Sequence, residues 1–152
     1  MRRVNWSRLL RWSAIGFLVL LVAIQLVHYG REHSNPPVVA EPAWDSPRTR
    51  ELARVACFDC HSNETSWPWY SNVAPLSWWL QDHVDEGRRE LNFSEWGRPQ
   101  ETDEIVESVE EGEMPPRSYT LAHSSARLSA EEEQALVDGF VAMFGPGDRD
   151  DD

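Results

Sequence analysis

The sequence contains no lysine, only two cysteines and only three methionines among its 152 residues. All 14 basic residues are arginines, against 26 acidic residues, and the formal net charge is −12. Because nucleic-acid affinity depends on basic patches, this balance argues against a nucleic-acid binder. Two cysteines leave no second ligand pair for a structural zinc site. The sequence has no alternating strand pattern and no internal repeat, so it predicts an all-α protein.

The N-terminal residues form a separate part of the chain. Four arginines in residues 1–11 precede an apolar run over residues 12–29, "WSAIGFLVLLVAIQLVHY", which has the length of a membrane span. The basic flank predicts a cytoplasmic N-terminus, with Trp12 and Tyr29 at the two membrane interfaces. A cleaved signal peptide is the alternative, but its apolar core is normally shorter and is closely followed by a small-residue site. We therefore expect a single uncleaved transmembrane anchor in a bacterial cytoplasmic membrane, with the rest of the chain outside the cytoplasm.

Proline content and charge divide the remaining chain. Residues 30–45 are rich in proline and predict a tether, residues 46–145 predict one helical domain, and residues 146–152 predict a disordered acidic tail. Residues 1–30 carry four arginines and no acid. Because the formal net charge of the whole chain is −12, residues 31–152 carry a formal charge of −16. Such a field favours a partner with a basic docking face, although solubility alone would also account for it.

Apolar periodicity and capping residues predict four helices in the domain. They cover about 47–60, 75–91, 102–111 and 129–144. Ser129 and Glu132 form a capping box at the start of the last helix.

The candidate chemistry concentrates in "CFDCH" at residues 57–61. Cys57 and Cys60 lie one helical turn apart and can form thioethers with the two vinyl groups of a porphyrin, while His61 can bind its iron. We expect one covalently attached haem c. A thioredoxin-like redox pair shares the cysteine spacing, but it belongs to a βαβ context that the sequence does not show. A disulfide across so short a loop would constrain the unfolded chain very little.

Met114, in "EGEMPPRSY", is the expected second axial ligand of the iron. The two prolines that follow it hold the chain extended, so a loop can present the sulfur. Met143 lies in an apolar helical stripe and is expected in the core. His83 and His123 are alternative ligands, and an open sixth position would permit ligand binding or peroxide chemistry.

Aromatic residues crowd the sequence after the cysteines. Trp67, Trp69, Tyr70 and Trp79 supply a large apolar area, and a small domain needs such area to wrap a macrocycle. We expect these side chains in the core and in the wall of the haem pocket. For any ring that is exposed, an electron-transfer path or a docking patch is the alternative.

The combined motifs resemble the small haem-binding domain family of bacterial monohaem c-type cytochromes. The matching text begins at "CFDCHSNETSWPWY", continues at "GEMPPRSYTLAH" and ends in "LSAEEEQALVDGF", within residues 50–144. The tether and the acidic tail lie outside this resemblance. It implies a cytochrome-c-like helical fold, covalent haem c at Cys57 and Cys60, and His61 and Met114 as axial ligands.

The sequence thus predicts a membrane-anchored monohaem c-type cytochrome that transfers one electron at a time on the periplasmic side. Its partners would be redox proteins, and we expect an electron carrier rather than an enzyme. One alternative is a haem-based sensor or small peroxidase with an open sixth position on the iron. A second is a thiol-disulfide oxidoreductase that uses Cys57 and Cys60 as a redox pair.

Overall fold

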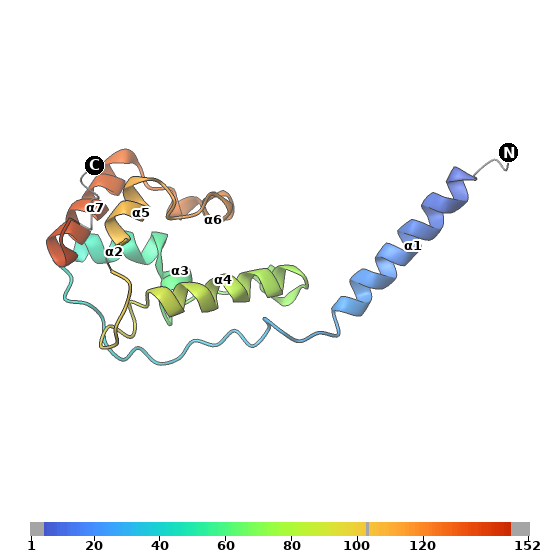
Figure 1. Ribbon diagram of the computed structural model, residues 1–152, viewed down its shortest axis with the longest axis horizontal. Coiled ribbons are helices and arrows are strands. Elements are labelled where there is room, and N and C mark those ends of the chain that lie inside the picture. The colour runs from blue at the N-terminus through green and yellow to red at the C-terminus, as the bar shows by residue number, and fades with distance from the viewer. Residues whose placement is uncertain (1–4, 103, 147–152) are drawn as a thin grey trace. The chain divides into compact units, whose positions relative to one another are not determined.

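The computed structural model describes residues 5–102 and 104–146 (Figure 1). Arg2, Arg3, Asp103 and the acidic tail from residue 147 onward lie outside the described residues. Across the described part of the chain there is no strand, only an isolated bridge between Ala40 and Glu95. The all-α prediction is therefore confirmed. The described α-helices are α1 Trp6–Ile24, α2 Pro47–Ala56, α3 Phe58–His61, α4 Leu76–Glu90, α5 Ile105–Glu110, α6 Arg117–Ala122 and α7 Ala130–Phe144.

Capping residues mark the helix starts that the sequence predicted. The Ser46 side chain accepts a hydrogen bond from the Thr49 amide at the start of α2. Ser129 and Glu132 form the expected capping box at the start of α7. The single helix expected over 47–60 was wrong, because Cys57 leaves helical geometry, with φ −122° and ψ −34°, and separates α2 from α3. Helix α6 and two short 3₁₀ helices, Trp69–Asn72 and Ser124–Ala126, were not expected.

The described chain divides into two compact units. Unit 1 contains the described residues up to His33 together with Pro68–Asp82, and unit 2 contains Ser34–Trp67 together with the described residues from His83 onward. In unit 1, α1 is a 19-residue helix with no buried side chain, long and apolar enough to cross a membrane. A helix of this length rises about 28 Å, close to the thickness of a bilayer's hydrocarbon core.

Unit 2 has an apolar core between α2, α5 and α7 (Figure 1). Its largest fully buried apolar side chains are Phe93, Phe140, Leu136, Val84 and Val106. Helices α2 and α7 approach closely at Gly139, where a Cβ would lie 2.4 Å from Thr49 Oγ1. The Phe93 ring stacks between neighbouring aromatic rings, at 5.5 Å from Phe58 and 6.2 Å from Phe140. This core supports the residues of the candidate site.

The proline-rich stretch predicted as a tether contacts unit 2 through its backbone. The Val39 amide donates to Ser94 O at 2.8 Å, and the Trp96 amide donates to Ala40 O at 3.0 Å. Pro37 O accepts from the Asn63 side chain at 3.2 Å. Residues 34–45 are thus bound along the unit rather than free of it.

Candidate functional site

A cavity of about 420 Å³ opens in unit 2, within the usual volume range of cofactor sites. It brings together Cys57, Cys60, His61 and Met114, which the sequence analysis assigned to one site. Apolar side chains supply much of the remaining wall, namely Ala56, Leu91, Phe93, Ile105, Val109 and Phe140. Residues 57 and 114 are far apart in the chain, so the core packing of unit 2 brings the four together.

The two cysteines lie on one tight turn. Cys57 ends α2 and precedes α3, and its carbonyl accepts hydrogen bonds from the Cys60 amide at 3.1 Å and from the His61 amide at 2.9 Å. Both thiols are free and border the cavity. Burial raises the pKa of Cys57 to about 12 and that of Cys60 to about 11. The burial that raises these pKa values disfavours the thiolate form of both cysteines.

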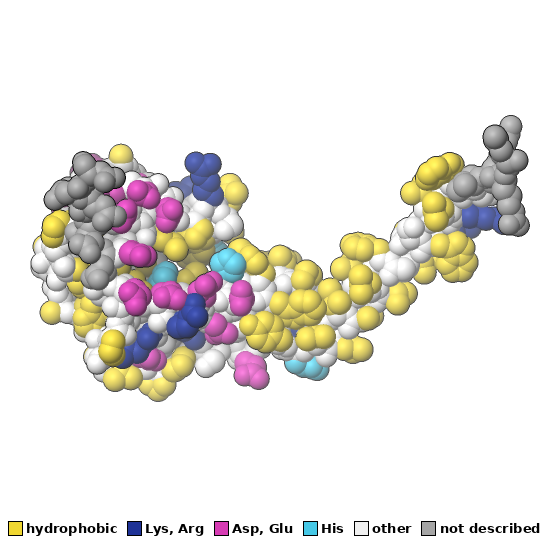
Figure 2. Space-filling view, viewed as in Figure 1, with side chains coloured by type: hydrophobic (Ala, Val, Ile, Leu, Met, Phe, Trp, Pro, Cys, Tyr) yellow, Lys and Arg dark blue, Asp and Glu magenta, His cyan; other side chains and the backbone are white. Residues whose placement is uncertain are grey.

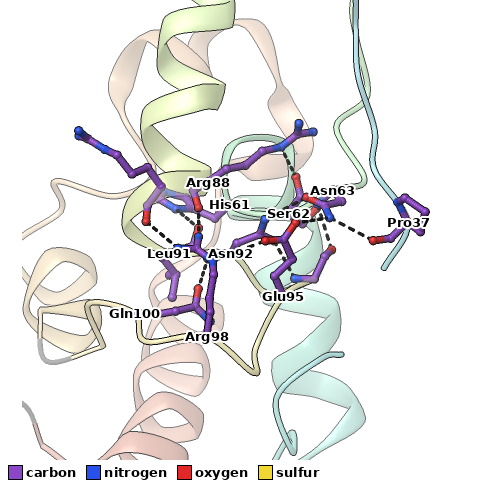
Figure 3. Close-up of polar contacts among 12 residues, drawn as sticks. Pro37, His61, Ser62, Asn63, Arg88, Leu91, Asn92, Glu95, Arg98 and Gln100 are labelled. Atoms are coloured by element: carbon purple, nitrogen blue, oxygen red, sulfur yellow. Dashed lines mark hydrogen bonds and ion pairs between the residues drawn. The ribbon is translucent and has the colours of Figure 1, made fainter. Parts of the chain in front are cut away.

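The imidazole of His61 is oriented by two backbone carbonyls of α4 and the turn after it (Figure 3). Its Nδ1 lies 3.0 Å from Gly87 O and 3.2 Å from Leu91 O. Carbonyl oxygens only accept hydrogen bonds, so Nδ1 carries the proton and Nε2 keeps its lone pair for a metal. Burial lowers the pKa of His61, which further favours the neutral ring. This is the tautomer that an iron ligand requires.

Gly87 allows α4 to approach the cysteine turn. A Cβ at this position would lie 2.7 Å from Cys60 O and 3.1 Å from Cys60 Cβ. The same residue supplies the carbonyl at 3.0 Å from His61 Nδ1. The missing side chain therefore determines how closely the helix holds the histidine.

Met114 follows α5 and lies on the wall of the cavity, with 38% of its surface exposed. Ser108 O holds this turn, because it accepts from the amides of Glu113 at 3.0 Å and of Met114 at 2.9 Å. Pro115 and Pro116 also line the cavity and lead into α6.

The chain matches the family model of a haem-binding domain over residues 19–142. It belongs to the haem-binding domain family. No curated protein and no solved structure matches it. The family match begins within α1 and includes the proline-rich stretch, so the sequence analysis was wrong to place that stretch outside the resemblance. The stretch is also hydrogen-bonded within unit 2, where Pro37 contacts Asn63 and residues 39–40 contact Ser94 and Trp96.

A buried polar network supports the backbone after His61 in this haem-binding domain (Figure 3). Asn63 Nδ2 donates to Glu95 Oε1 at 3.0 Å, and Asn63 Oδ1 accepts from Asn92 Nδ2 at 2.9 Å. Arg88 Nε donates to Ser62 O at 2.8 Å, while its Nη2 donates to Thr65 Oγ1 at 2.9 Å. Because the buried amides are hydrogen-bonded, they fix one loop conformation. Arg88 was not expected from the sequence, where it is one of several charged residues near the end of a helix.

A second unexpected contact links the cysteine turn to α6. Tyr119 lines the cavity, and its hydroxyl donates to Asp59 Oδ2 at 2.6 Å. The other carboxylate oxygen of Asp59 accepts from the Ser66 amide at 2.8 Å. Burial, followed by the bond to Asp59, raises the pKa of Tyr119. Asp59 lies between the two cysteines, so this bond connects the cysteine turn with α6, the helix that follows Met114.

The two histidines considered as alternative ligands lie in different places. His83 lines the cavity, on the same helix as Gly87. His123 is not among the described residues that line the cavity; its ring stacks on Tyr119 with centroids 4.2 Å apart, and its Nδ1 lies 3.1 Å from Tyr119 O. Of the two, His83 is therefore the residue adjacent to the site.

None of the four aromatic residues assigned to the pocket wall is among the described residues that line this cavity. Trp67 belongs to unit 2, where its Nε1 donates to Asn35 Oδ1 at 3.3 Å. Trp69, Tyr70 and Trp79 belong to unit 1, and Trp69 is 80% exposed. Their contact with haem stays a prediction.

Acidic side chains line part of the cavity. Figure 2 shows Asp and Glu side chains gathered on the visible face of unit 2. Four exposed glutamates are among the residues that line the cavity, namely Glu86, Glu90, Glu101 and Glu104. Part of the negative charge predicted from composition thus lies beside the site.

Proposed function

We propose that this haem-binding protein is a membrane-anchored monohaem c-type cytochrome that transfers single electrons outside the cytoplasm. The observation that carries the proposal is the meeting of Cys57, Cys60, His61 and Met114 around one cavity. The two thiols suit covalent attachment, and the apolar wall suits the faces of a macrocycle. When bound, the haem iron supplies reversible one-electron oxidation and reduction.

The residues of the chain would hold and tune this iron. His61 presents an unprotonated Nε2, because its Nδ1 donates to the carbonyls of Gly87 and Leu91. Met114 would supply a thioether, a soft ligand that favours the reduced iron and raises its reduction potential. The apolar wall residues, such as Leu91, Phe93 and Phe140, would lower the polarity around a bound haem, which would further favour the less charged state of its iron.

The decisive experiment compares two methionines in the full chain, exported in a host that matures c-type cytochromes. Met114→Ala is expected to remove the sulfur-to-iron absorption band of the oxidised protein and to lower its reduction potential. Met143→Ala is the control, because Met143 is half-buried in α7 and does not line the cavity. A wild-type c-type haemochrome after denaturation would support covalent attachment. An unchanged band in Met114→Ala would contradict the ligand assignment.

A sensor or small peroxidase is the second candidate function. It is favoured by His83, which lines the same cavity and could assist a bound ligand or peroxide. This function requires an open or displaceable sixth position. A wild-type protein that is high-spin, or whose reduced form binds carbon monoxide, would favour it over electron transfer.

Contacts at the end of α1 support its role as a retained anchor rather than a cleaved signal. Gln25 caps α1 and forms two hydrogen bonds with Ala74, which lies on the far side of the cysteine motif in the sequence. Cleavage after Gln25 would remove this partner of Ala74 from unit 1. The mass of the protein extracted from membranes is expected to correspond to a chain that still contains residues 5–24. A mature form that starts after residue 30 would contradict the anchor.

The acidic rim of the cavity favours a basic redox partner. With hexaammineruthenium(II) as a cationic electron donor, the rate of haem reduction is expected to fall as ionic strength rises, because salt screens the attraction. Glu104→Gln should reduce this salt dependence more than Glu133→Gln, since Glu104 lines the cavity and Glu133 is an exposed residue of α7. A rate independent of salt would contradict docking at the acidic rim.

A further inference from the structure

The C-terminal end of α1 is joined to residues that lie about fifty positions further along the chain. Gln25 Nε2 donates to Ala74 O at 2.9 Å, and Gln25 Oε1 accepts from the Ala74 amide at 3.0 Å. These reciprocal bonds satisfy the backbone of Ala74 with the residue that caps α1. Both residues belong to unit 1, so its segment from Pro68 to Asp82 is held against the end of the apolar helix.

Other contacts within unit 1 strengthen this junction. His33 Nε2 lies 3.2 Å from Ser71 O. Gly30 adopts φ +74°, and a Cβ there would overlap the carbonyl of Ser77. Arg31 donates to the carbonyl of Gln25 at 3.0 Å and to its side-chain oxygen at 2.8 Å. An arginine and several polar groups thus collect where a membrane helix would leave the hydrocarbon core, as at a headgroup interface.

The segment at this junction exposes large apolar side chains. Trp69 is 80% exposed, and three further residues of the segment are exposed by 41–49%, namely Val73, Leu76 and Trp79. Residues 67–81 contain no charged residue, although the chain after residue 30 carries −16. An exposed apolar surface of this kind marks an interaction site, and tryptophan is the residue type enriched at membrane interfaces.

We propose that residues 68–79 form an interfacial segment that inserts into the headgroup region of the bilayer crossed by α1. The proposal rests on the anchor role of α1 in the proposed function. A lipid surface is the occupant that the contacts favour, because the segment continues the apolar surface of α1 through exposed Leu26, Val27 and Tyr29. The hydrogen bonds of Gln25 hold it at the depth where that helix ends.

Spin labels at three positions of the full-length, haem-loaded protein test the proposal. The protein is placed in nanodiscs of phosphatidylethanolamine and phosphatidylglycerol, and collision of each label with oxygen and with a water-soluble nickel chelate is measured. Val73→Cys reports on the interfacial segment without loss of a tryptophan. Leu18→Cys in α1 and Leu121→Cys in unit 2 are the lipid and water references, at 60% and 77% exposure.

For each label, the collision rate with oxygen is divided by the collision rate with the nickel chelate. This ratio is expected to be at least twofold higher for the label at 73 than for the label at 121. A label at 73 that meets the chelate as often as the label at 121 would overturn the interfacial segment while α1 stays in lipid. Water access at 18 as well would instead overturn the anchor. A label at 73 that is shielded from both reagents would show a protein contact, such as a second copy, and would also overturn the proposal.

Replacement of the most exposed ring gives an independent test. In the Val73→Cys protein, Trp69→Ser is expected to increase collision of the label with the nickel chelate at least twofold, because an interfacial anchor is lost. The haem absorption spectrum of the same variant is recorded as well, because it separates a membrane role of Trp69 from the predicted contact of this ring with haem. A changed haem spectrum with unchanged chelate collision would place Trp69 in the haem pocket and refute its membrane role.

Discussion

Gly87→Ala is the substitution whose effects the structure defines most sharply. Its Cβ would lie 2.7 Å from Cys60 O, whereas ordinary contact begins at 3.4 Å, so backbone atoms must separate by about 0.7 Å. Overpacking of this kind costs about 1–3 kcal/mol. Alanine recovers up to about 1 kcal/mol of helix propensity relative to glycine. We therefore expect a net loss of about 1 kcal/mol in the free energy of unfolding, or a melting temperature lower by about 4–8 °C.

The same displacement weakens the hydrogen bond between His61 Nδ1 and Gly87 O, now 3.0 Å long. A bond from Nδ1 to a carbonyl makes the imidazole a better donor to oxidised iron, so its loss is expected to raise the reduction potential. A net hydrogen-bond energy of about 0.5–1.5 kcal/mol corresponds to at most about 20–60 mV for one electron. Redox titration of the holoprotein, followed by thermal unfolding, measures both effects.

Gly97→Ala is the control for this prediction, because no atom lies within 4 Å of a Cβ at that position. Its melting temperature and reduction potential should stay close to those of the wild type. If Gly87→Ala behaves like Gly97→Ala in both measurements, the close approach of α4 to Cys60 does not position the histidine. A lowered melting temperature with an unchanged potential would limit Gly87 to a packing role.

Two further predictions concern stability. Tyr119→Phe removes the hydroxyl that donates to Asp59 at 2.6 Å, and we expect thermal unfolding to show a loss of about 1.5 kcal/mol, a loss that Tyr70→Phe should not reproduce. Hydrogen bonds from Arg50 lower the pKa of Glu41 from its ordinary 4.5, so this contact stabilises the fold above pH 4.5 and is lost as pH falls through the lower folded-state pKa. Glu41→Gln should reduce the dependence of the unfolding free energy on pH in that acidic range, and an unchanged slope would contradict the linkage.

The helices show how much of the fold local sequence patterns can predict. Apolar periodicity and capping residues predicted α4, α5 and α7 to within a few residues, because these signals act within one helical turn. The break at Cys57 was missed, since no breaking residue marks it and the turn is fixed by contacts with the rest of unit 2. The six-residue α6 was also missed, because it is too short for a periodic pattern and follows two prolines.

The residues of the candidate site could also be predicted from the sequence only in part. Cys57, Cys60 and His61 are adjacent in the chain, so their spacing alone indicated haem attachment, and the family match over residues 19–142 supports haem binding. Met114 was chosen because its loop suited a ligand, and the cavity brings it to the same place. The sequence assigned Trp69 to the haem pocket from composition. In the structure this ring belongs to unit 1 and is 80% exposed, and its contact with haem stays a prediction.

By itself, the sequence determined the all-α class, the apolar N-terminal helix and the position of the motif predicted to attach haem, because each depends on neighbours within a few residues. Only the tertiary structure decided which distant groups act on that motif. Gly87 is a mere helix-weakening residue in the sequence, yet its missing side chain lets a carbonyl reach His61. The bonds from Tyr119 to Asp59 and from Gln25 to Ala74 join residues about 60 and 50 positions apart. Such partners are chosen by packing across the fold, which leaves no periodic signal along the chain.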